Sequence, residues 1–98
     1  MGAQLETRRI DTIDRKEVEK IYGDMWDEAK DYYGSNPYSG SFATLEKHVN
    51  FRYVTFSSDH EAEKYIADNS DKWGSAVAVV VKDNNGKPHT LIGGWCAS

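Results

Sequence analysis

The C-terminal quarter of the chain holds two apolar runs separated by a turn signal, and this pattern constrains the fold more than any other. Residues 76–81 read AVAVVV, residues 91–95 read LIGGW, and Asn85 and Gly86 lie between them. Asn-Gly tolerates the positive φ angles of a type I′ turn best, and β-branched residues favour strands. The sequence therefore predicts a C-terminal β-hairpin that turns at Asn85 and Gly86.

The predicted turn also sets which side chains share a face of the hairpin. It places Ala78 opposite Gly93 and Val80 opposite Leu91, and side chains alternate along each strand. The other face then carries a set of larger apolar residues: Val77, Val79, Val81 and Ile92. The first strand is apolar on both faces, which is typical of a central strand covered on both sides.

Hydrophobic periodicity and capping residues predict two helices before the hairpin. A long helix is expected over residues 14–33, because Asp14 is a suitable N-cap and Gly34 a suitable C-terminal residue. Its apolar stripe follows three- and four-residue spacing and comprises Val18, Ile21, Tyr22, Met25, Ala29 and Tyr32. A capping box that begins at Ser58 predicts a second, shorter helix over residues 59–69.

Two further strands and a short turn complete the expected fold. Residues 4–10 read as a weak edge strand, residues 51–57 are rich in aromatic and β-branched side chains, and residues 42–49 fit one or two helical turns. We therefore expect a single α+β domain over residues 1–98. It combines a small, mostly antiparallel sheet of about four strands, a C-terminal β-hairpin, and one long and one shorter helix packed on the sheet.

The face of the sheet on which the two helices lie leads to a prediction about self-association. If both helices lie on the same face of the sheet, the face that carries Val77, Val79, Val81 and Ile92 is left open. An exposed apolar patch of this kind is normally buried by a partner. The sequence thus predicts a homodimer, packed sheet against sheet, with these four residues at its interface.

Composition narrows the classes of function. The chain has a net charge of −4, and its Lys and Arg residues are scattered, which disfavours binding to nucleic acid because phosphate contacts dominate that affinity. No apolar run approaches the roughly twenty residues that span a bilayer, and the N-terminus does not resemble a signal peptide. Cys96 is the only cysteine, which excludes an internal disulfide. We expect a soluble, cytoplasmic protein.

Motifs for catalysis or for cofactor binding are weak. His48, His60 and His89 fall on three different predicted elements without the short spacing of metal ligands, so no metal site is expected. Cys96 and His89 are an odd number of positions apart on one strand and therefore point to opposite faces, which argues against a thiol nucleophile with its base. We expect neither a catalytic residue nor a cofactor.

The opening strand and helix, together with the late hairpin VVVKDNNGKPHTLIGG, superficially resemble the N-terminal half of GNAT acetyltransferases. The diagnostic loop Q/R-x-x-G-x-G/A, which holds the pyrophosphate of acetyl-CoA in that family, is absent from this chain. The resemblance therefore implies no acetyl-CoA site and no active-site residue.

One face of the long helix is acidic, and the first functional hypothesis is based on it. Its carboxylates follow one another at helical neighbour spacing: Asp24, Asp27, Glu28 and Asp31. Such a row is locally unfavourable, because like charges repel and acids in the last turn oppose the helix dipole. A solvated face on an acidic protein is the simpler explanation of the row.

We expect a small, acidic, non-enzymatic binding or regulatory protein that docks on a more basic protein partner. The four carboxylates would steer the encounter, and Tyr33 and Tyr38 would anchor it. Small acidic proteins of phages and mobile elements that inhibit host factors have this general appearance.

The alternative hypothesis is an enzyme or a small-molecule-binding protein with a pocket between the hairpin and the helices. Small residues of the hairpin, Ala76, Ala78 and Gly93, would leave space for a ligand. The other walls would come from Trp73, Trp95 or His89.

Overall fold

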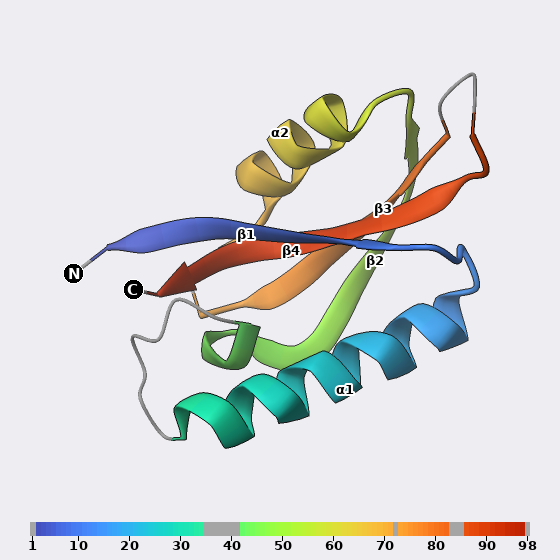
Figure 1. Cartoon of the computed structure of the whole chain (residues 1–98). Helices are drawn as coiled ribbons and strands as arrows, with labels where there is room; N and C mark the ends of the chain where they lie inside the picture. Colours follow the sequence, from blue (N-terminus) through green and yellow to red (C-terminus); the bar gives the residue numbers. More distant parts are fainter. Residues whose placement is uncertain (1, 35–41, 72, 83–85, 98) are drawn as a thin grey trace.

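The protein is described here by a computed structural model that covers residues 2–34, 42–71, 73–82 and 86–97. Its elements are β1 (Ala3–Ile10), α1 (Arg15–Tyr33), a 3₁₀ turn η1 (Phe42–Thr44), β2 (Glu46–Phe56), α2 (Asp59–Asn69), β3 (Ser75–Val81) and β4 (His89–Ala97) (Figure 1). The predicted α+β fold with its four-stranded sheet is confirmed. Asn85 and Tyr38, which carried two of the predictions, lie outside the described residues.

The sheet has the order β1-β4-β3-β2 and is mixed. β4 pairs antiparallel with both β1 and β3, whereas β2 pairs parallel with β3. A parallel neighbour requires a crossover connection, which α2 supplies between β2 and β3. The predicted edge position of the first strand is confirmed.

Local capping explains why both predicted helix boundaries agree with the structure. The Asp14 side chain accepts a hydrogen bond from the Lys16 backbone N–H at 3.0 Å and so caps α1. At the other end Gly34 adopts a positive φ of 62°. The Ser58 hydroxyl caps α2 by accepting from the Glu61 N–H at 3.2 Å.

Between the helices the prediction was less accurate. Only Phe42–Thr44 form a helical turn, and β2 begins at Glu46, five positions before the predicted Phe51. Residues 42–49 therefore divide between a turn and a strand. A short apolar stretch does not distinguish these two structures by its periodicity.

The two helices cover opposite faces of the sheet (Figure 1). On the α1 side, Val18 and Tyr22 pack in one core cluster with Ala76, Ala78 and Ile92. The α2 side is built by a second cluster of buried residues: Ala62, Ile66, Val77, Val79, Val81 and Leu91. Each face of the central strand β3 is thus shielded by the chain itself.

This arrangement corrects the expectation of an open apolar face. The exposed fractions of Val77, Val79, Val81 and Ile92 are 1%, 0%, 1% and 0% within one chain. The prediction failed because it placed both helices on the same side. The argument for a homodimer through these residues was an exposed apolar face, and it therefore no longer holds.

The register of the hairpin differs by one residue from the prediction. Ala78 lies opposite Ile92, not Gly93, and Val79 lies opposite Leu91. A one-residue slip moves every side chain of a strand to the other face. Ile92 consequently joins the α1 side, and Leu91 joins the valines. Because β3 is apolar on both faces, its pattern could not select the register.

Two glycines are expected to respond in opposite directions to substitution by alanine. A Cβ at Gly93 would meet the Glu6 carbonyl oxygen and would lie 2.8 Å from Thr7 Cγ2, so Gly93→Ala should force β1 away and lower the free energy of unfolding by about 1–3 kcal/mol.

A Cβ at Gly23, within α1, would meet only Lys47 Cε at 3.9 Å. Gly23→Ala should therefore raise the free energy of unfolding by about 0.5–1 kcal/mol.

Urea denaturation of the two variants beside the wild type measures both changes. A Gly93→Ala protein as stable as the wild type would contradict the close packing of β1 on β4.

Candidate functional site

A groove of about 560 Å³ lies between α1 and β1 and is the best candidate for a binding site. Polar and apolar side chains line it: Glu6, Arg8, Met25, Glu28, Ala29, Tyr32, Tyr33 and Phe42. Most of these residues belong to β1 and α1, which are consecutive in the chain, and Phe42 belongs to η1. The distance between α1 and the edge strand β1 determines the width of the groove.

The backbone geometry explains which residues line the groove. Glu6 and Arg8 lie opposite Gly94 and Ile92 of β4, and Ile92 belongs to the α1-side core. The side chains of Glu6 and Arg8 therefore point to the α1 side of the sheet. On α1, residues 25, 28, 29 and 32 recur at three- and four-residue spacing and so share one flank of the helix.

Aromatic rings form the end of the groove. Tyr32 and Tyr33 meet in a T-shaped contact with ring centroids 4.8 Å apart. Their exposed fractions are 81% and 42%. Phe42 is buried and packs edge-on against Tyr22, whose hydroxyl donates to the Glu46 carbonyl at 3.0 Å. Exposed tyrosines beside a firmly packed wall are typical anchors for a partner.

The structure separates the predicted acidic residues. All four are exposed, but only Glu28 lines the groove. Asp27 points toward β2, where its carboxylate pairs with Lys47 Nζ at 2.7 Å. The charges of Asp24 and Asp31 lie on the solvent side between these two. Of the predicted anchors, Tyr33 lines the groove, and Tyr38 is outside the described residues.

Of the described residues that line the groove, the sequence prediction placed only Glu28 and Tyr33 at a binding surface. Tyr32 was assigned to the buried stripe of the helix, yet only Val18 and Tyr22 are fully buried in α1. Nothing in the sequence indicated that Glu6 and Arg8 belong to a binding surface, apart from their alternate positions on a weak strand. The sequence analysis predicted no pairing partner for the first strand, so the position of Arg8 opposite Ile92 was not anticipated.

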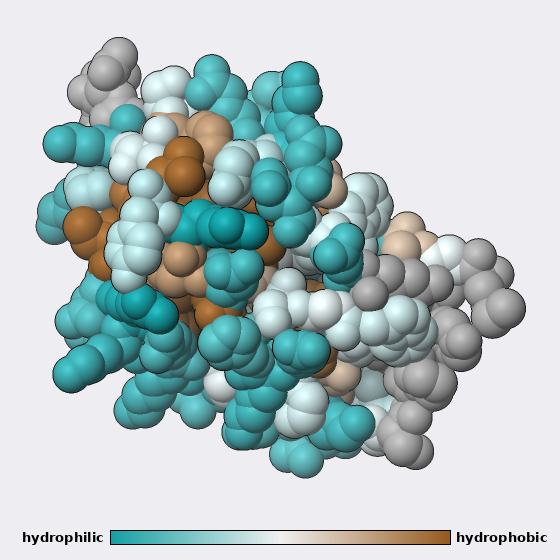
Figure 2. Space-filling view, turned by 180° about the vertical axis from the view of Figure 1, so that it is seen from behind, coloured by the Kyte–Doolittle hydropathy of each residue, from teal (hydrophilic) through white to brown (hydrophobic). Residues whose placement is uncertain are grey.

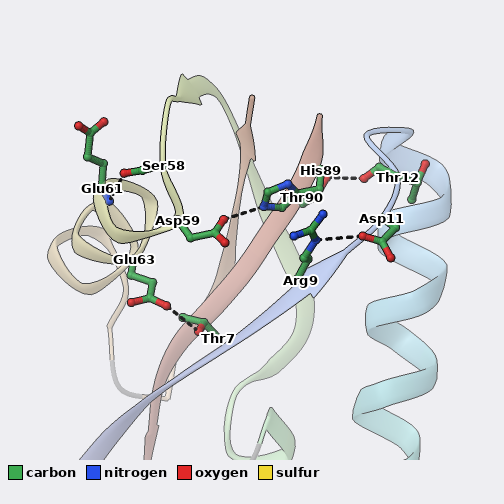
Figure 3. A network of polar contacts seen from close by, with 10 residues as sticks. All are labelled: Thr7, Arg9, Asp11, Thr12, Ser58, Asp59, Glu61, Glu63, His89 and Thr90. Carbon is green, nitrogen blue, oxygen red and sulfur yellow. Dashed lines mark hydrogen bonds and ion pairs between the residues drawn. The ribbon is translucent and has the colours of Figure 1, made fainter. Parts of the chain in front are cut away.

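A second polar cluster lies where β1, α2 and β4 meet (Figure 3). His89 Nε2 is 2.6 Å from Asp59 Oδ1, and His89 is buried whereas Asp59 is half-exposed. Nearby, the Thr7 hydroxyl donates to Glu63 at 3.5 Å, and on the other face of β4 the Thr90 hydroxyl donates to the Thr12 carbonyl at 2.7 Å.

An imidazole beside a carboxylate can serve in acid–base catalysis if a substrate reaches it. Here the pair joins the first turn of α2 to the start of β4. We therefore assign it to holding α2 on the sheet.

A third exposed region follows the edge strand β2. On the side of the molecule seen from behind, Figure 2 shows apolar side chains surrounded by hydrophilic ones. Tyr53 and Val54 of β2 are exposed, and Arg15 Nη1 lies 2.5 Å from the Tyr53 hydroxyl. The pairing of β2 with β3 is interrupted by two register shifts, and Lys47 and Arg52 add charge to the strand. Such features protect an edge from pairing with another strand.

Most residues of the alternative pocket are packed by the protein itself, although Trp73 is exposed. Ala76 and Ala78 are fully buried in the α1-side core, and Gly93 lies against the backbone of β1. The Trp95 indole N–H donates to the Ala67 carbonyl at 2.8 Å. Space beside the small residues of the hairpin is therefore filled by the chain.

Cys96 also has a structural environment. It is fully buried in the α1-side core, and burial raises the pKa of its thiol to about 11. His89 lies opposite Val81, on the α2 side of the sheet, so the two residues do not meet. A thiol held in its protonated form is a poor nucleophile.

Within the described ranges, no group of three or more His, Cys, Asp or Glu residues is placed to hold a metal ion. Neither helix in the part of the chain that the structure describes is long and apolar enough to cross a membrane. Comparison of the chain with family models, with curated proteins and with solved structures found no match.

Proposed function

We propose that the protein is a small, non-enzymatic binding protein that docks on a basic surface of another protein through the C-terminal half of α1 and the groove beside it. The observation that carries this proposal is the exposure of Tyr32 and Tyr33 at the end of a groove that also holds Glu28. Aromatic side chains that bury large area at low entropic cost dominate many interfaces.

Charge supports the same surface. Asp24 and Asp31 are exposed on α1 beside the groove, and the whole chain carries a net charge of −4. Carboxylates at the rim of an interface raise the rate of encounter with a basic partner more than they raise the affinity. Asp27 contributes less, because Lys47 already neutralises it.

The proposal is tested by affinity capture from the protein's own host with matched charge-reversal variants. The variant Asp24→Lys/Glu28→Lys reverses two charges at the proposed surface without breaking the Asp27–Lys47 pair. The control, Asp68→Lys/Asp71→Lys, changes the net charge equally at exposed positions at the end of α2 and just beyond it. We expect a partner that the wild type and the control recover and that the α1 variant loses.

Binding of the recovered partner should then be measured at several salt concentrations. The α1 variant should associate about ten times more slowly at low salt, and its association rate should depend less on salt. Equal association rates for the α1 variant and the control would refute docking through α1.

A further inference from the structure

The described residues that line the groove combine an excess of negative charge with apolar side chains. Among them, Glu6 and Glu28 supply two carboxylates against the guanidinium of Arg8, which leaves one formal negative charge. Met25 and Phe42 are among the apolar side chains that line it. A site of this composition favours a cation with an apolar stem.

The charge is uneven along the groove. β1 and α1 run in opposite directions (Figure 1), so Glu6 lies nearer than Arg8 to the C-terminal end of α1. Tyr32 and Tyr33 lie at that same end. A cation that enters at this end meets aromatic faces and acid groups together.

The protein already combines these groups around one of its own arginines. The guanidinium of Arg15 lies 5.9 Å from the centre of the Tyr53 ring, and its Nε pairs with Glu19 at 3.2 Å. A guanidinium suits such a site better than an ammonium, because its plane stacks on an aromatic ring while its N–H groups reach a carboxylate. The groove presents the same two partners, a tyrosine and a glutamate, to a side chain from outside.

We infer that the groove receives an arginine side chain of the partner, stacked on Tyr32 and paired with Glu28; this inference rests on the proposed docking function. The aliphatic stem of this arginine would contact the apolar residues that line the groove. Glu6 would add attraction at the same end, and Arg8 would keep the incoming cation away from the other end.

A pair of short peptides tests this without knowledge of the partner. Acetyl-Gly-Arg-Gly-amide carries the cation, and the same peptide with citrulline has nearly the same shape without the charge. Each is titrated into the ¹⁵N-labelled full-length protein, and amide shifts are followed by NMR. We expect the arginine peptide to bind several-fold more tightly and to shift the signals of residues 28, 32 and 33 most.

Matched variants separate the groove from the general acidity of α1. Glu28→Gln and Asp24→Asn each remove one exposed carboxylate from α1, but only Glu28 lines the groove. Glu28→Gln and Tyr32→Ala should each weaken the arginine peptide about two- to five-fold, whereas Asp24→Asn should weaken it less. Circular dichroism of each variant verifies that α1 remains folded.

Equal binding of the arginine and citrulline peptides, or equal weakening by Glu28→Gln and Asp24→Asn, would overturn the inference. Neither result affects the docking proposal, which is tested separately by the capture experiment with the Asp24→Lys/Glu28→Lys variant.

Discussion

Replacing Ile66 by alanine should lower the free energy of unfolding by about 2–5 kcal/mol. Ile66 is fully buried on α2 and packs with Val77, Val79 and Val81 against the sheet. Deleting three carbon atoms there removes apolar burial and leaves a cavity that rigid strands cannot collapse to fill. Urea denaturation followed by circular dichroism measures the loss.

Ile21→Ala is the matched control, because it makes the same chemical change on α1 at a side chain that is 37% exposed. We expect it to cost clearly less than Ile66→Ala, since more than a third of the Ile21 side chain is already in contact with water. The wild-type midpoint should also be independent of protein concentration. A midpoint that rises with concentration, together with a small effect of Ile66→Ala, would mean that a second copy covers the valines in place of α2.

The helix boundaries were predictable because capping is local. Asp14, Gly34 and Ser58 each act on backbone groups within a few positions along the chain, so neither the layers nor the sheet order had to be known. The same holds for the apolar strands of the hairpin. Local chemistry therefore determined the position of most elements.

The arrangement of the layers was not predictable in this way. A strand that is apolar on both faces, such as β3, fits a helix on either side and two hairpin registers equally well. The side of the sheet that α2 covers depends on the parallel pairing of β2 with β3. That pairing is a contact between distant segments, and the alternation of either strand does not encode it.

The candidate site shows the same division. Glu28 and Tyr33 were expected at a binding surface, because exposed acids and a tyrosine at the end of a helix are visible in the sequence. Glu6 and Arg8 join them only because β1 lies along α1 in three dimensions. The ion pair of Asp27 with Lys47 likewise needed the position of β2. A row of four equivalent acids in the sequence thus becomes one groove residue, one paired residue and two solvated ones.

Raising the pH from 9 to 11 should destabilise the protein, and Cys96 should account for about 2 kcal/mol of the loss. Burial raises the pKa of this thiol from its ordinary value of 9.0 to about 11. Below pH 9 the thiol is protonated in both the folded and the unfolded chain, so its contribution is fully present. Above pH 9 the unfolded chain releases the proton and the folded chain retains it, which favours unfolding until the folded thiol also ionises near pH 11.

Cys96→Ala isolates this contribution. Burial also raises the pKa of Tyr22, and that effect persists in the variant with the same sign, so both proteins should lose stability at high pH. The alanine protein should be the less stable one at pH 8, because it has a small cavity, but its free energy of unfolding should fall less steeply between pH 9 and pH 11. The measurement is a series of urea denaturations across this range. Parallel curves for the two proteins would show that the Cys96 thiol ionises as easily in the folded chain as in water, which is incompatible with its complete burial in the α1-side core.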